Sequence, residues 1–348
     1  MYRDGALLMY CKRRGFTIVE LMVSITLGLL ITAAAVQLFF SGQLSYIMQK
    51  GMADVQDNGN FGLRFVTYEL RKSNYGKMDK INDRLKNGGI VITSAQAPLL
   101  PTVSVLNHSS NTIPLNLPRT IMSSVQIPVS KSGLVTNARV ADSASGLQTS
   151  IGLGSDQLVV QFYADRNGID CEGNSYTAGR FIVQRFFLRE DIKTSLDPHL
   201  ALVLACEAGS YVGDESTTIL RNVRRPSVFG STIGQILMYR VDHFHYLLGI
   251  SNDSNTANKR YIAIEDYKKI NEFPRPRINS IQIGVLVRST ESIGLSNLIS
   301  DDQEFQVLDQ VVQLKKAKGT NSKFLRQVVS QTIALRNGLT VTDTAEGL

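Results

Sequence analysis

The stretch KRRGFTIVELMVSITLGLLITAAAVQLFF, from Lys12 to Phe40, joins a basic cluster to a long apolar run. From Phe16 onward the run contains one charged residue, Glu20. It exceeds the roughly 20 residues with which an α-helix crosses the hydrocarbon of a bilayer. Its serine and threonine hydroxyls can donate to a backbone carbonyl one turn earlier, so a membrane tolerates them. We therefore expect a membrane-spanning helix over residues 16–40.

The residues around the run indicate its orientation and its class. Arg13 and Arg14 precede it, so its start should face the cytoplasm and the C-terminal mass should be translocated. A secretory signal would have a shorter apolar region closed by a small-residue cleavage site. Here Ala33–Ala35 is followed by Val36 with no break in the helical pattern. A plain anchor leaves Glu20 unexplained, because a charge at the centre of a spanning helix costs about 2.5–3.5 kcal/mol.

Glu20 has a physical role if the chain is cut between Gly15 and Phe16. The new α-amino group on Phe16 would be a cation, and Glu20 would be the fifth residue of the shortened chain. The amine and the carboxylate could then pair between adjacent subunits. Because a buried ion pair contributes more to specificity than to stability, this pair could set the register of stacked helices.

These residues resemble a known signal. The basic leader, the segment Gly15–Leu21 (GFTIVEL) and the long apolar helix are similar to the type IV prepilin signal. In that family a membrane peptidase cuts after the glycine and methylates the new N-terminal phenylalanine. The resemblance implies a cleaved leader over residues 1–15, N-methylation of Phe16 and an assembly role for Glu20.

A helical pattern continues beyond the membrane segment. Apolar or small residues recur every three or four positions; they are Leu44, Met48, Met52, Val55, Gly59, Leu63, Val66 and Leu70. No proline occurs before Pro98, so we expect one helix over residues 16–73 whose second half packs on the protein's own head. Glycines within it weaken the helix by about 1 kcal/mol each relative to alanine; they include Gly42, Gly51, Gly59 and Gly62.

The head divides into two parts by composition. Residues 74–155 hold five of the nine prolines amid many polar residues, which predicts an irregular loop region with short strands near Ile90–Thr93 and Thr102–Leu106. The pattern over residues 156–348 is typical of β-structure. The candidate strands are Gln157–Ala164, Arg180–Arg189, His199–Cys206, Gln235–Leu248, Ser280–Arg288 and Phe324–Arg336. Residues 251–277 form a polar insertion that we expect to be extended and exposed.

The predicted fold class is α+β, a pilin-like long N-terminal helix packed on a mostly antiparallel sheet. In the last candidate strand, Leu325, Val329 and Ile333 fall on one face and Arg326 and Ser330 on the other. The alternation indicates one buried face, for which the apolar stripe of the helix is the natural cover.

The head carries a second resemblance. Its size, the segment QIGVLVRSTES (Gln282–Ser292) and the closing VVSQTIALRN (Val328–Asn337) are similar to the PilW group of minor pilins. The resemblance implies a non-enzymatic minor pilin that helps to prime a type IV pilus, at or near its tip. The implied partners are other minor and major pilins, the prepilin peptidase and the inner-membrane assembly platform. The implied location is the inner membrane, with a single pass and a periplasmic head, and then the extracellular pilus.

Other functions stay open on the sequence. A minor pseudopilin of a type II secretion system, J type, is the nearest competitor. A tip adhesin or a DNA-binding pilin would rely on basic stretches such as Arg221–Pro226 and Lys315–Gly319. The formal charge of +7 is partly confined to the leader, so the remainder is too mild to argue nucleic-acid binding by itself. A membrane-anchored enzyme would need a pocket with shifted titratable groups.

Two cysteines would remain after cleavage. Cys11 would leave with the leader, whereas Cys171 and Cys206 would lie outside the cytoplasm, where disulfides persist. We expect a disulfide between them; the alternative is two free buried thiols.

Motifs for metals, cofactors or catalysis are weak. His243 and His245 lie two apart on a candidate strand, but with no third ligand nearby they indicate ordinary packing rather than a metal pair. The segment DRNGID (Asp165–Asp170) departs from an EF-hand, because its glycine stands at the fourth position and Tyr176 occupies the twelfth. We therefore expect no metal, no cofactor and no enzymatic activity.

Processing at the prepilin site can be tested by mass. Mass spectrometry of the membrane-extracted protein should find a chain that begins at Phe16 and is heavier by one methyl group. A chain that begins at Met1, or near Ala35, would contradict the prepilin interpretation.

Overall fold

The structure is a computed structural model, and it describes eleven segments of the chain. They are residues 15–76, 89–92, 124–127, 155–191, 201–212, 234–252, 255–270, 275–294, 299, 303–313 and 323–336. The chain forms two compact units, residues 1–50 and residues 51–348, which are described separately.

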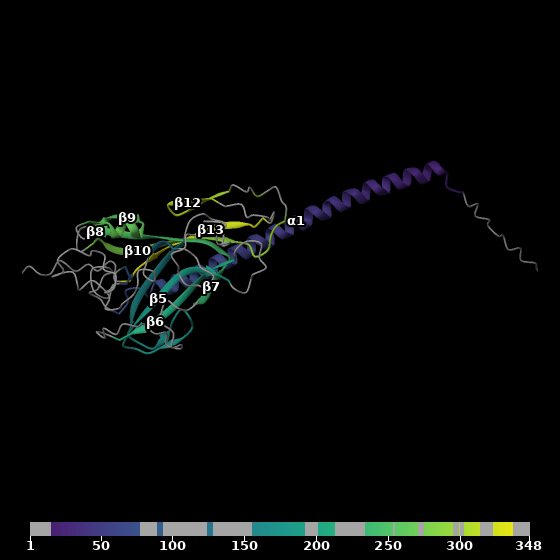
Figure 1. The fold of residues 1–348 in the computed structure, drawn as a ribbon. Helices are drawn as coiled ribbons and strands as arrows, with labels where there is room; N and C mark the ends of the chain where they lie inside the picture. Colours follow the sequence, from purple (N-terminus) through teal and green to yellow (C-terminus); the bar gives the residue numbers. More distant parts are fainter. Residues whose placement is uncertain are drawn as a thin grey trace, which may run out of the picture. The chain divides into compact units, whose positions relative to one another are not determined.

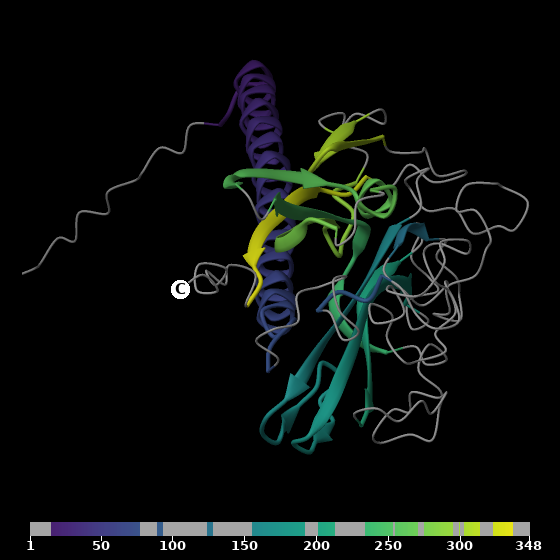
Figure 2. The same ribbon diagram turned by 90° about the vertical axis from the view of Figure 1, so that its left-hand side faces the viewer.

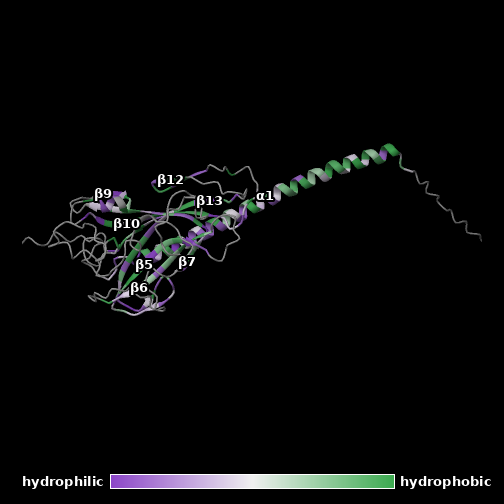
Figure 3. Ribbon diagram, viewed as in Figure 1, coloured by the Kyte–Doolittle hydropathy of each residue, from purple (hydrophilic) through white to green (hydrophobic). Residues whose placement is uncertain are grey.

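One long helix, α1, runs from Ile18 to Leu70 (Figure 1). Within the described residues it is the one helix long and apolar enough to cross a membrane, and Figure 3 shows its N-terminal half as mainly hydrophobic. Three hydroxyls bond back along the helix as expected: Ser24 Oγ donates to the Glu20 carbonyl at 2.8 Å, and Thr26 and Thr32 make equivalent bonds of 2.9 Å. These three hydroxyls therefore satisfy their hydrogen bonds within the helix.

The strands of the second unit form two main sheets (Figures 1 and 2). A five-stranded sheet has the order β1-β2-β5-β6-β7, and each neighbouring pair is antiparallel. Its strands are β1 (Ser124–Ile127), β2 (Ser155–Ala164), β5 (Arg180–Glu190), β6 (Leu202–Tyr211) and β7 (Gln235–Tyr239).

The second main sheet has the order β13-β10-β8-β9 and is also antiparallel throughout. Its strands are β13 (Arg326–Ala334), β10 (Arg277–Arg288), β8 (Val241–Asn252) and β9 (Asn255–Ile262). Two small hairpins accompany the sheets: β3 (Gly168–Ile169) with β4 (Ser175–Tyr176), and β11 (Glu304–Val307) with β12 (Gln310–Gln313). The predicted α+β class, with a long helix and antiparallel sheets, is confirmed.

The C-terminal half of α1 packs on both main sheets through its glycines. A Cβ atom added at Gly59 would lie 2.8 Å from Val329 Cγ2 of β13, and one added at Gly62 would overlap Met238 of β7. Figure 2 shows β13, in yellow, alongside this part of α1. The glycines that weaken the isolated helix thus allow its backbone to approach the sheets closely.

Two expectations about the head are wrong in detail, and another lies outside the described residues. The candidate strand Gln235–Leu248 is two strands, β7 and β8, which belong to different sheets and are separated at Arg240 by a positive φ of 54°. The expected strand Thr102–Leu106 lies outside the described residues. Near the other expected short strand, Ile90 forms an isolated bridge with Val160.

The second correction concerns residues 251–277, which are extended and exposed only in part. They contain β9 and a short helix, α2 (Ile264–Lys268), and Ile264 and Tyr267 are buried. Arg275 is buried as well and closes this segment, because its guanidinium donates to the carbonyls of Lys268 and Ile270 at 3.1 Å. Ile264 and Tyr267 belong to the main apolar core of the head, a contact that the polar composition of the segment concealed.

The close contact at Gly62 predicts that alanine is destabilising there but harmless at Gly42. Gly62→Ala should lower the free energy of unfolding of the head by roughly 1–3 kcal/mol, the usual range for overpacking, because the new methyl group would overlap the fully buried side chain of Met238, which would have to shift. Thermal unfolding followed by circular dichroism in detergent measures the effect.

Gly42→Ala is the matched control, since nothing lies within 4 Å of a Cβ atom at that position. It should leave the melting temperature of the head unchanged. A Gly62→Ala protein as stable as the wild type would contradict the close contact.

Candidate functional site

The proposed processing site lies just before the helix. Gly15, Phe16 and Thr17 precede α1, and the Phe16 side chain is 82% exposed. No atom lies within 4 Å of where a Cβ atom would stand on Gly15. The bond between Gly15 and Phe16 is therefore in an exposed, non-helical segment, as a peptidase substrate requires.

Glu20 stands in the first turn of α1 and is exposed. Thr17 is the N-cap, because its Oγ1 accepts a hydrogen bond from the Glu20 backbone N–H at 3.2 Å. Thr17 and Glu20 have the spacing of a capping box, and a carboxylate near the helix N-terminus interacts favourably with the macrodipole. Glu20 thus also suits its own helix, a role that the prepilin resemblance obscured and that the Thr-x-x-Glu spacing could have indicated.

Cys171 and Cys206 are joined as a disulfide in the structure, with their Cα atoms 6.1 Å apart. Cys206 is in β6 and Cys171 is in the segment between β2 and β5, residues 165–179, which we call the disulfide loop. Both cysteines are buried. Glu172 adds a second tie between the same segments, because its Oε2 accepts from the Ala208 N–H at 3.0 Å.

The oxygen atoms of the DRNGID segment serve the turn rather than a cation. Asp170 Oδ1 accepts from the backbone N–H groups of Glu172 and Asn174 at 3.0 and 2.8 Å. Asp165 accepts from the Tyr75 hydroxyl at 2.8 Å, and Asn167 Oδ1 accepts from a backbone N–H. Burial raises the pKa of Asp170, although these bonds oppose the rise. Among the described residues, no group of three or more His, Cys, Asp or Glu side chains is arranged to hold a metal ion.

The two histidines of β8 are brought together but are bonded to other side chains. Their rings stack with centroids 6.4 Å apart. His243 Nε2 lies 3.0 Å from Gln310 Oε1, and both nitrogens of His245 contact carboxylates, those of Asp156 and Asp309. The sequence placed the pair on one face of a strand, but it gave no sign of the partners.

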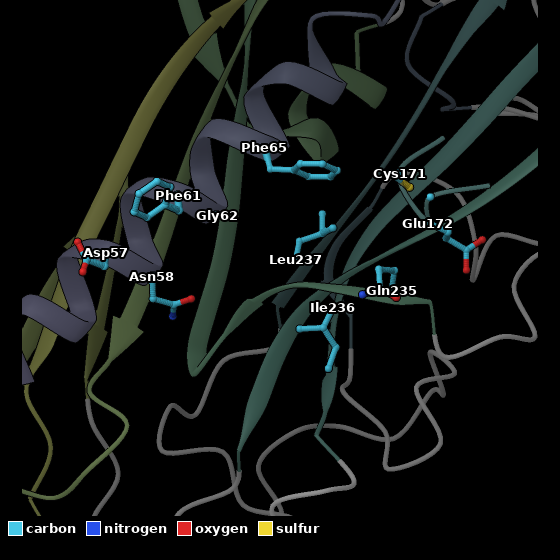
Figure 4. A pocket seen from close by; sticks show the side chains of 11 residues that line it. Asp57, Asn58, Phe61, Gly62, Phe65, Cys171, Glu172, Gln235, Ile236 and Leu237 are labelled. Atoms are coloured by element: carbon cyan, nitrogen blue, oxygen red, sulfur yellow. The ribbon is translucent and has the colours of Figure 1, made fainter. Parts of the chain in front are cut away.

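A groove of about 710 Å³ lies beside the disulfide loop (Figure 4). α1 contributes the aromatic rings of Phe61 and Phe65, and Figure 4 shows Phe65 extending toward Leu237 of β7. The charged residues among its described lining are the carboxylates Asp57 and Glu172. Sequence reasoning missed this groove, because its walls come from three segments that are distant in the chain.

The groove also lies at the edge strand of a sheet. The amide of Asn58 in α1 donates to the Tyr239 carbonyl, and Asn58 Oδ1 accepts from the Tyr239 N–H at 3.2 Å. This side chain pairs with the backbone of β7 as a neighbouring strand would. It therefore protects the end of an edge that could otherwise pair with another chain.

Comparison with known proteins supports both resemblances. Residues 10–36 match the family model of the prokaryotic N-terminal methylation motif, and residues 211–337 match that of the type IV pilus-assembly protein W family, PilW. Among curated proteins, none matches the chain.

One solved structure, a type IV-like pilin from Thermus thermophilus, is similar to the chain at 10% identity and a TM-score of 0.27. The match covers 53% of this chain and 79% of that one, and at so low a TM-score it supports no argument. The two family matches confirm, by themselves, that the chain is similar to type IV prepilin-like minor pilins of the PilW type.

Proposed function

We propose that this protein is a minor pilin that helps to initiate type IV pilus assembly and is located at or near the filament tip. The observation that carries the proposal is the union, in one chain, of the methylation motif at residues 10–36 with a PilW-type head at residues 211–337. A membrane-capable helix, Ile18–Leu70, begins within this motif. The protein acts by assembly, with the prepilin peptidase, the assembly platform and other pilins as its partners, and not as an enzyme.

The first step of this function is processing at the membrane. The peptidase cuts between Gly15 and Phe16 and methylates Phe16, and α1 holds the protein in the inner membrane with its head in the periplasm. The exposed, non-helical conformation of these residues supports this step. The Glu20 carboxylate then pairs with the α-amino group of an adjacent subunit, where misregister would leave two unpaired charges in a medium of low dielectric.

The size of the head supports the proposed tip position. The second compact unit spans residues 51–348 and contains two main sheets. A head of this size is too bulky to repeat along a thin filament. A subunit of this kind is therefore rare and serves at the start of the filament.

The alternatives have less support. The matched family model is a pilus-assembly one, which favours a pilus over a type II secretion pseudopilus. The basic segments Arg221–Pro226 and Lys315–Gly319, on which DNA binding would rely, lie outside the described residues. The groove would repel a polyanion, because its charged lining residues, Asp57 and Glu172, are carboxylates.

The role of Glu20 is tested by removing its charge. Glu20→Ala and Glu20→Gln should leave membrane insertion and cleavage intact, because loss of a charge eases insertion. Crosslinking of this subunit to other pilins, and surface piliation, should fall several-fold in a strain that expresses only the variant.

Two control variants separate the charge from the helix. Ser24→Ala removes a hydroxyl that bonds only to its own helix, and Thr17→Ala removes the cap but keeps the carboxylate. Both should assemble nearly as well as the wild type. Wild-type crosslinking and piliation in the Glu20 variants would show that the carboxylate has no assembly role.

We also propose that the Cys171–Cys206 disulfide is present in the periplasmic protein. Because both sulfurs are buried, alkylation should be carried out after denaturation without a reductant. A disulfide then leaves both cysteines unlabelled, whereas free buried thiols become labelled. The double variant Cys171→Ser/Cys206→Ser should lose roughly 2–4 kcal/mol of stability. Labelling of both cysteines in the unreduced chain would exclude the bond.

A further inference from the structure

The β11–β12 hairpin covers the face of the four-stranded sheet that α1 does not contact. On the α1 face, Val329 of β13 meets Gly59. On the other face, Leu286 of β10 and Val328 of β13, which are paired in register, pack against the hairpin. The hairpin contributes Phe305, Val307 and Val312 to this second apolar cluster. Removal of the hairpin would expose the cluster to water.

His245 links the hairpin to both main sheets. It lies in β8 opposite Gly284 of β10, on the hairpin side of the sheet. Its Nδ1 is 2.6 Å from Asp156 Oδ2 in β2, and its Nε2 is 2.7 Å from Asp309 Oδ1 in the β11–β12 turn. A neutral imidazole can donate from one nitrogen only, so with both carboxylates ionised both contacts are hydrogen bonds only when the ring is an imidazolium.

The charges around His245 favour the protonated ring. Asp156 is buried, and its Oδ2 also accepts from the Tyr246 N–H at 3.2 Å, which marks it as an acceptor. Burial opposes the charge on His245, but the hydrogen bonds and charges of Asp156 and Asp309 outweigh it and raise the pKa of the ring. Gly284, directly opposite on β10, contributes no side chain.

Two further titratable groups among the described residues, His243 and Asp242, lie on β8 near His245. Burial lowers the pKa of His243, the neighbouring ring on β8, which lies beside the uncharged Gln310. His243 is therefore neutral in the range where His245 titrates. Asp242 is engaged in buried ion pairs with Arg288 and Arg326, with N–O distances of 3.2 and 2.7 Å.

The β11–β12 turn has a strained backbone, so contacts with the sheet are needed to stabilise it. Leu308, the residue before Asp309, has a φ of 57°, in the left-handed region that costs a non-glycine residue roughly 1–2 kcal/mol. Its side chain lies over Gly284, where an added Cβ atom would stand 2.9 Å from Leu308 Cγ. Two adjacent residues of the turn thus contact the sheet: Leu308 packs over Gly284, and Asp309 contacts the His245 ring.

We propose that His245 is a proton-dependent latch that holds the β11–β12 hairpin on the four-stranded sheet and releases it when the ring loses its proton. The raised pKa gives the direction. The stabilisation is complete below the ordinary histidine pKa of about 6.5 and is lost as the pH rises through the higher value in the folded protein. The hairpin is therefore docked at a pH near the ordinary histidine pKa. At a pH above the higher pKa of the folded protein, it opens and exposes Leu286 and Val328.

The latch can be measured on the full-length protein in detergent. The chain has four histidines, so protein labelled with ¹³C-histidine gives a small set of ring signals, from which the His245 titration follows. Amide exchange of the hairpin, corrected for the intrinsic pH dependence, reports its opening. The opening constant should rise by up to about tenfold per pH unit as His245 deprotonates, the slope for one proton.

Two hairpin variants separate the charge from ordinary packing. Asp309→Asn removes a carboxylate that is 53% exposed, so the head should still fold, and both the His245 titration and hairpin opening should move to lower pH. Gln310→Ala removes an uncharged partner of His243 and should weaken docking at every pH without moving the midpoint.

The proposal fails under any of three results. The first is that His245 in the wild type titrates at or below the ordinary histidine pKa. The second is that amide exchange of the hairpin stays constant while His245 deprotonates. The third is that Asp309→Asn keeps the wild-type midpoint of the His245 titration. If His245→Gln folds, its hairpin opening should be independent of pH in the alkaline range.

Discussion

The close approach of α1 to two sheets is the constraint on which the head depends. Gly59 faces Val329 of the four-stranded sheet and Gly62 faces Met238 of the five-stranded sheet, so one helix forms a wall of the core for both. Glycine is unfavourable in an isolated helix, and these residues are stable there only because tertiary packing compensates. The N-terminal half of α1 has no such contacts and is exposed. Its apolar composition instead suits a lipid environment.

Buried charges position the strands of the head within this core. Arg185 of β5 pairs with Glu207 of β6 at 2.7 Å, and neither side chain is exposed. Asp242 binds Arg288 and Arg326, and so connects β8, β10 and β13. A shifted strand would leave such groups unpaired and buried, which costs far more than a misplaced apolar contact. These pairs therefore serve mainly to fix the alignment of the strands. In the same way, the contact between His245 and Asp309 positions the hairpin.

The arrangement suits a protein whose function is assembly. Its membrane-capable helix begins within the matched methylation motif, and the apolar residues of its N-terminal half are exposed, as contact with a membrane or with neighbouring helices would require. The groove beside the disulfide loop combines the rings of Phe61 and Phe65 with the carboxylates of Asp57 and Glu172. Among the described residues, the features that bear on the proposed function are exposed contact surfaces and the segment around Gly15 and Phe16.

The sequence by itself determined the long helix, the α+β class and the prepilin-like motif, because each depends on local periodicity or on adjacent residues. The tertiary structure decided the division of Gln235–Leu248 at Arg240, the burial of Arg275 and the partners of His245. Each of these depends on residues brought together from distant parts of the chain. Asp156, for example, lies in another sheet, and strand alternation predicts which face a side chain occupies but not what will cover it.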